Sequence, residues 1–194
     1  MTRFSDAIAF ASSGDIRSPD GDLSKYLDRK EQPMKTMEML GTAKEALPPC
    51  NIDAESSVLS VCLLTDEGAK KMSALLVPED FFRVSHQHIF RAVQTLVGRG
   101  RPVDHITVAE SLEKQGMLDA VGGRSALLSL ADNTFAIVNC EYHAGIVART
   151  SMQRRLIEAA TKIACMASAP QDDVCEVREE ALRLVREAVS DRRV

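Results

Sequence analysis

Residues Asn139–Ala167, NCEYHAGIVARTSMQRRLIEAATKIACMA, contain no proline and only one glycine. An uninterrupted helix over this stretch would be roughly 40 Å long at about 1.5 Å per residue, which exceeds the diameter of a small domain. We therefore predict that this helix projects beyond the domain that carries it.

One side of the predicted helix is apolar over a wide sector. At about 100° per residue, the apolar side chains of this sector fall on a stripe that is wider than one partner helix covers. Arg149 points toward the stripe, where an unpaired guanidinium is costly, so it should reach solvent or pair with a carboxylate across an interface. The stripe consists of Tyr142, Ile146, Met152, Leu156, Ile157, Ala160, Ile163 and Ala164, and Arg154, Arg155, Glu158 and Lys162 lie opposite.

A second helix is predicted from Asp173 to about Val189, after the break SAPQDD. Glu179 and Arg183 are spaced for an ion pair on its outer side. We expect the two helices to fold back as an αα-hairpin. The apolar face of the second helix is formed by Val174, Val177, Ala181, Leu184, Val185 and Ala188.

That second face is too narrow to cover the whole stripe, so the remaining apolar surface is predicted to bind another copy or another protein. The candidate interface residues are Ile146, Arg149, Met152, Leu156, Ile157, Ala160 and Ile163.

Short helices are predicted before the hairpin, in a globular domain over residues 48–137. The segment LPPCN marks its start, and Asn51 or Asp53 can cap the first helix. Nothing alternates with a period of two for long enough to form a strand. The expected helices lie near Asp53–Leu64, Gly68–Leu76, Ser85–Val97, Thr107–Gln115 and Arg124–Ala131.

The predicted fold is therefore all-α, with about five to six short helices followed by a long hairpin over residues 138–190. Residues 1–47 mix Ser, Asp, Gly and Lys with weak periodicity and are expected to form a flexible tail. In the globular part, Thr107 with Glu110 suggests a capping box for a helix that stops at Gly116, and Gly122-Gly123 closes the next short segment.

The composition narrows the functional classes. A hydrophobic content of 45% in 194 residues is ample for a packed core. A net charge of -4 and a pI near 5.6 argue against a surface built to neutralise phosphates, so any contact with DNA is expected to be indirect or weak. No apolar run approaches the roughly 20 residues that a bilayer requires, and the N-terminus does not have the layout of a signal peptide. We expect a cytoplasmic protein without a membrane contact.

The sequence predicts no metal or cofactor site. His86 and His88 are two residues apart, so on a helix they point about 200° away from each other. Cys140 and His143 could share a helix face, but two ligands do not complete a tetrahedral site. The five cysteines are odd in number and widely spaced, which is typical of reduced, buried thiols.

Catalytic residues are not predicted either. Glu79 and Asp80 follow Pro78, and acidic residues after a proline are typical of a helix N-terminus. The Gly122-Gly123 pair is not followed by Gly-Lys-Ser/Thr, so it does not form a phosphate-binding loop.

Several segments together resemble the N-terminal domain of bacterial replicative DNA helicases of the DnaB type, over roughly Pro48 to Ala164. They are IDAESSVLSVCLL, LVPEDFFRVSHQHIFRAVQTLVGRGRPVDHITVAESLEKQGMLDAVGGRSALLSLADN and NCEYHAGIVARTSMQRRLIEAATKIA. The order and spacing of Pro78-Glu79-Asp80-Phe81, Pro102-Val103-Asp104, Val121-Gly122-Gly123 and Arg155-Leu156-Ile157 carry the resemblance. Ser56, Ser60 and Phe82 depart from the residues that the family pattern expects.

The resemblance implies a helical domain plus a hairpin, with hairpins of neighbouring subunits forming a collar on a hexameric ring. It implies self-association as a dimer or higher, including a trimer of dimers, and docking surfaces for primase or a helicase loader. In this family ATP hydrolysis belongs to a RecA-like motor domain, and the chain has no Walker lysine.

We therefore expect a non-catalytic assembly and partner-docking module of a replicative helicase. One alternative is a stand-alone regulator or decoy that binds a host helicase through the same hairpin. Another is an enzyme or metal protein built on the cysteines and histidines.

Overall fold

Helices form all the regular structure in residues 47–132, 139–168 and 174–190, which the computed structural model describes. The predicted all-α class is confirmed, and each predicted helix end lies within two residues of the observed one. The predicted flexible tail, residues 1–47, lies outside the described residues except for Leu47. The helices are α4 (Ile52–Leu64), α5 (Asp66–Leu75), η2 (Pro78–Asp80), α6 (Val84–Gly98), α7 (His105–Lys114), η3 (Asp119–Val121), α8 (Gly123–Ala131), α9 (Cys140–Ser168) and α10 (Val174–Val189).

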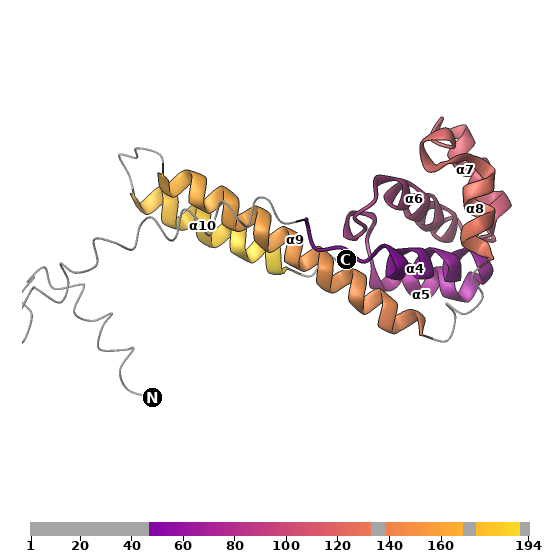
Figure 1. The fold of residues 1–194 in the computed structure, drawn as a ribbon, viewed down its shortest axis with the longest axis horizontal. Helices are drawn as coiled ribbons and strands as arrows, with labels where there is room; N and C mark the ends of the chain where they lie inside the picture. The colour runs from indigo at the N-terminus through magenta and orange to yellow at the C-terminus, as the bar shows by residue number, and fades with distance from the viewer. Residues whose placement is uncertain (1–46, 133–138, 169–173, 191–194) are drawn as a thin grey trace, which may run out of the picture. The chain divides into compact units, whose positions relative to one another are not determined.

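Helix α4 is the centre of the globular part, which comprises α4 to α8. It packs against α5, α6, α8 and α9 (Figure 1). Val58, Leu59 and Cys62 on this helix are fully buried, because a helix that is apolar on most sides is stable only when it is surrounded. The rings of Phe81 and Phe90 add an aromatic pair to this core, with centroids 4.8 Å apart.

Side-chain caps fix where the helices begin. Asn51, not Asp53, caps α4, because its Oδ1 accepts the N–H of Ala54 at 2.9 Å. The capping box expected for Thr107 with Glu110 is wrong. Helix α7 begins two residues earlier than predicted, so the box joins Asp104 and Thr107.

In this box Asp104 Oδ1 accepts the Thr107 N–H at 2.7 Å, and Thr107 Oγ1 accepts the Asp104 N–H at 3.0 Å. The hydrogen bond from the Thr107 amide lowers the pKa of Asp104 below its usual value. At the other end of α7, Gly116 adopts a φ of 68° and terminates the helix as predicted.

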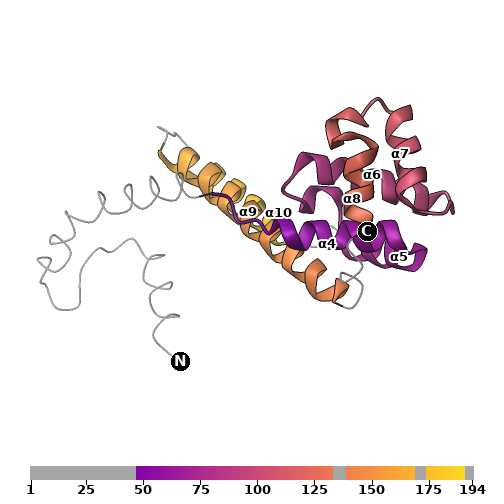
Figure 2. The ribbon, with the colours of Figure 1, turned by 45° about the vertical axis from the view of Figure 1, so that its right-hand side comes forward.

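Helices α9 and α10 lie side by side in both Figure 1 and Figure 2, so the predicted hairpin is confirmed. The first half of α9 packs on the globular part and buries Ala144, Val147 and Ser151. The second half packs on α10, where Ala159 and Ala188 are buried.

Two details of α10 differ from the prediction. Arg183 pairs with Glu180 and Glu187, while Glu179 pairs with Arg178, because several acidic residues within one turn compete for one guanidinium. Val185 is exposed, although it was assigned to the face that packs on the first helix.

The prediction of buried thiols holds only for Cys62. Burial raises the pKa of the Cys62 thiol well above its usual value. Cys140 is half-buried, whereas Cys50, Cys165 and Cys175 are exposed. Cys50 precedes the first described helix, Cys165 lies on α9 and Cys175 lies on α10.

Gly68 provides a test of the tight packing between α4 and α5. A Cβ at this position would lie 2.5 Å from Val61 Cγ1 and 2.8 Å from the Val61 carbonyl oxygen. Since the backbone oxygen cannot move away, Gly68→Ala should lower the free energy of unfolding by about 1 to 3 kcal/mol in urea denaturation. Gly98→Ala is the matched control, because nothing lies within 4 Å of its added Cβ. An equal effect of the two substitutions would contradict the packing argument.

Candidate protein-interaction surface

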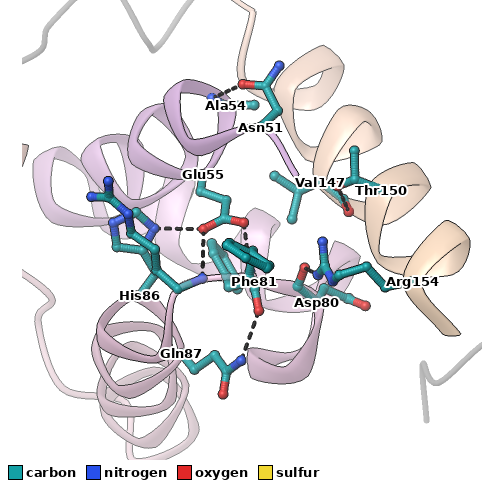
Figure 3. Close-up of polar contacts among 12 residues, drawn as sticks. Asn51, Ala54, Glu55, Asp80, Phe81, His86, Gln87, Val147, Thr150 and Arg154 are labelled. Carbon is teal, nitrogen blue, oxygen red and sulfur yellow. Dashed lines mark hydrogen bonds and ion pairs between the residues drawn. The ribbon is translucent and has the colours of Figure 1, made fainter. Parts of the chain in front are cut away.

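A buried carboxylate on α4 holds the segment between η2 and α6. Glu55 is completely buried. Its Oε1 accepts the Phe82 N–H at 2.7 Å, and its Oε2 lies 2.8 Å from His86 Nδ1 (Figure 3). The Arg83 N–H donates to the same Oε2 at 3.4 Å. A carboxylate tolerates such burial only when its oxygens are hydrogen-bonded, so the turn before α6 is fixed over Glu55.

A second polar group joins this turn to α9. The Ser151 hydroxyl donates to Asp80 Oδ1 at 2.7 Å. Arg154 donates from Nη2 to the Asp80 carbonyl oxygen at 2.6 Å and from Nη1 to the Pro49 carbonyl oxygen at 2.8 Å. In Figure 3 the Arg154 side chain reaches from α9 toward Asp80. These bonds fix the direction in which α9 leaves the globular part.

The environment of Arg154 combines burial with nearby negative charge. Burial lowers the pKa of its guanidinium, and the carboxylates of Glu55 and Asp80 oppose that shift. The group remains charged, since an arginine is not deprotonated in proteins. The guanidinium also lies 5.7 Å from the centre of the Phe82 ring, at a distance typical of a cation–π contact.

The structure places most of the predicted interface residues on one exposed side of α9. Met152, Leu156 and Ile157 remain between 38% and 47% exposed, although α10 packs beside them. Arg149 and Ala160 are also exposed, and Ile163 is half-buried. Ile146 differs from this group, because it packs partly against the globular core.

Helix α10 adds a second apolar row, of which only Val185 was assigned from the sequence, and to a different face. Leu182, Val185 and Val189 are between 43% and 48% exposed. Their spacing of three and four residues places them on one face of a helix. This spacing could have revealed the row, but it overlaps the row that packs on α9.

The register of the hairpin brings the two rows together. Arg155 Nη1 donates to the Ser190 carbonyl oxygen at 3.1 Å, so this part of α9 lies beside the C-terminal end of α10. In the antiparallel pair Leu156 is therefore nearer to the end of α10 that carries Val189, and Ile163 is nearer to Leu182.

A polar groove occupies one side of the hairpin. Arg155, Glu158, Lys162 and Glu187 line it together with three small or apolar residues. Helical spacing places both exposed apolar rows on the other side. We call this side the hairpin apolar face: Met152, Leu156, Ile157, Ala160, Ile163, Leu182, Val185 and Val189. Several exposed apolar side chains on one side of a helix pair are typical of a protein-interaction site.

The other candidate residues take structural positions. His86 contacts Glu55, and Glu79 forms an exposed ion pair with Arg91 at 2.9 Å. Across the described residues, no three His, Cys, Asp or Glu side chains gather closely enough to hold a metal ion. None of the described helices combines the length and the hydropathy needed to cross a bilayer.

The described residues thus form a globular set of short helices fixed to a helical hairpin with an exposed apolar face. Residues 47–149 match the family model described as the DnaB-like helicase N terminal domain. The chain belongs to this family, as the resemblance implied.

Curated relatives support the same assignment. The chain is 39% identical over 149 residues to the replicative DNA helicase DnaC of Bacillus subtilis, which covers 77% of this chain and 33% of that protein. It is 40% identical over 149 residues to the replicative DNA helicase DnaB of Geobacillus stearothermophilus, with the same coverage of 77% and 33%. The chain thus spans about a third of the length of these relatives.

Solved structures share the fold. The N-terminal domain of the DnaB helicase from Mycobacterium tuberculosis superposes with a TM-score of 0.68 at 36% identity, covering 73% of this chain and 99% of that one. A DnaB-like replicative helicase, described together with its interactions with primase, gives a TM-score of 0.60 at 25% identity and covers 73% and 32%.

Glu55 provides a test of the buried junction. Glu55→Ala removes the acceptor of the Phe82 and Arg83 amides and leaves His86 without its partner carboxylate. We expect a loss of about 3 to 5 kcal/mol in the free energy of unfolding, measured in urea. Glu79→Ala is the control, because its ion pair with Arg91 is exposed and should contribute less than about 1 kcal/mol. Similar losses in the two variants would show that the Glu55 junction is not a major source of stability.

Proposed function

We propose that this chain acts as a non-catalytic assembly and partner-docking module of a replicative DNA helicase. In this proposal residues 138–190 form the assembly hairpin, and residues 48–137 form the domain on which partners dock. The hairpin apolar face is the observation that carries the proposal, because it exposes a row of apolar side chains from each of two helices.

Self-association fits this face better than a small ligand does. Two copies of the hairpin can pack the same surface against each other around a two-fold axis, which buries both rows in a four-helix arrangement. Arg149 is exposed on the same side of α9 and can pair with a carboxylate of the second copy. A dimer, or a larger ring built from dimers, follows from repeating this contact.

Docking of primase or a helicase loader is the second part of the proposal. It is supported by the fold shared with the DnaB-like helicase that was described with its primase interactions. The Glu55 and Arg154 junctions give the globular part a fixed attachment to α9, so a partner bound there would be held in a defined orientation to the assembly.

Leu156→Glu tests the assembly face. A carboxylate at this position would have to lose its water in the packed interface, which costs several kcal/mol, about enough to break a modest contact. Multi-angle light scattering should show the wild-type chain as a multimer and the variant as a single chain.

Thr161→Glu is the matched control, since Thr161 is an exposed residue of α9 outside the hairpin apolar face. It should keep the wild-type mass. Val185→Glu tests the same face from α10 and should behave as Leu156→Glu does. A wild-type monomer, or an unchanged mass in both face variants, would overturn the assembly proposal.

A binding experiment tests the docking part separately. The immobilised wild-type chain should retain purified primase from the same organism, measured by co-elution. Leu156→Glu should still retain primase, because the substitution lies on the hairpin and not on the globular part. If neither primase nor a helicase loader is retained, the docking part fails and the assembly part stands.

A further inference from the structure

A groove lies between the end of α6 and α7, and none of its lining residues belongs to the hairpin. It has a volume of about 560 Å³. Four of its lining residues are basic and one is acidic. The lining consists of Arg91, Thr95, Leu96, Arg99, Arg101, Pro102, Thr107, Glu110, Ser111, Lys114 and Gln115.

The turn after α6 places two of the arginines at this groove. Gly100 adopts a φ of 65°, which a residue with a side chain rarely does. Its N–H donates to the Val97 carbonyl oxygen at 3.0 Å, and the Arg101 N–H donates to the Leu96 carbonyl oxygen at 3.0 Å. Since this pair of bonds is a fixed helix-ending turn, the backbones of Arg99 and Arg101 are held in place on either side of the glycine.

Among the described residues, the same two arginines have no ion-pair partner. Arg91 pairs with Glu79, and Lys114 pairs with Glu110. Arg99 and Arg101 form no ion pair with any residue that the structure describes. The pKa of the neighbouring Glu110 is lowered, first by the hydrogen bond from Lys114 and further by the nearby charges of Arg101 and Arg124.

Apolar and hydroxyl groups complete the groove. Leu96 and Pro102 offer apolar surface, and Thr95 and Ser111 offer hydroxyl groups. None of the lining residues is aromatic, so the groove has no ring on which a nucleic-acid base could stack.

We propose that this groove binds an acidic peptide segment of a protein partner. Carboxylates of the segment pair with Arg99 and Arg101, and an apolar side chain between them packs on Leu96 and Pro102. A guanidinium suits this role, because its planar fork can donate two parallel hydrogen bonds to one carboxylate. The site is separate from the hairpin apolar face and does not depend on self-association.

Fluorescence anisotropy tests the proposal with a labelled peptide of sequence Gly-Asp-Asp-Leu-Asp-Asp-Leu-Gly. The wild-type chain should bind it, and the affinity should fall as ionic strength rises. Arg101→Glu should weaken binding about tenfold or more, because it replaces an attraction by a repulsion. Arg99→Glu is a second variant with the same expectation.

Arg186→Glu on α10 is the matched control, since it changes the net charge equally at an exposed site outside the groove. This variant should bind the peptide like the wild type. A peptide with asparagine in place of aspartate should not bind to the wild-type chain. The unfolding midpoint and the mass of Arg101→Glu should remain those of the wild type, which separates this site from the fold and from the assembly face.

Two results would overturn the proposal. One is an equal loss of binding in Arg186→Glu, which would indicate diffuse attraction to the whole surface. The other is tighter binding of a labelled oligothymidylate than of the peptide, lost in Arg101→Glu, which would make the groove a nucleic-acid site.

Discussion

The burial of Glu55 is the constraint on which the rest of the structure depends. A carboxylate inside α4 needs several donors, and the chain supplies them from the turn before α6. Holding this turn also positions Asp80 and Phe82, which Arg154 contacts from α9. The direction of α9 is therefore set by these hydrogen bonds together with its packing on α4, because apolar packing alone is less directional.

Polar groups orient α9 on the globular part, whereas the exposed apolar groups of the hairpin lie elsewhere. The bonds of Ser151 and Arg154 lie on the side of α9 that faces the globular part. The hairpin apolar face lies on another side, where its large side chains are partly covered within the chain and partly exposed. Substitutions there can change what the protein binds while the core around α4 is maintained. The basic groove at Arg99 and Arg101 is independent of both, because it rests on the turn that ends α6.

Helix positions could be predicted from the sequence because local signals determine them. Asn51, Gly116 and the apolar periodicity of α9 act within one or two turns of the chain. The junction could not be predicted, since Glu55 and Arg154 meet the turn near Asp80 only after folding, and either residue alone looks like an exposed helix charge. The capping box at Asp104 was missed because Glu110 is equally well spaced from Thr107. The structure gives the exposure of the candidate interface residues, and their role in an interface remains a prediction.

The bond from Arg155 to Ser190 joins α9 to the C-terminal end of α10. A slip of α10 by one residue would rotate its side chains by about 100° relative to α9 and carry Leu182, Val185 and Val189 out of line with their neighbours. The hairpin apolar face would then no longer form, although each helix would still be intact. A hairpin out of register would therefore lack the shared face that the proposed assembly requires.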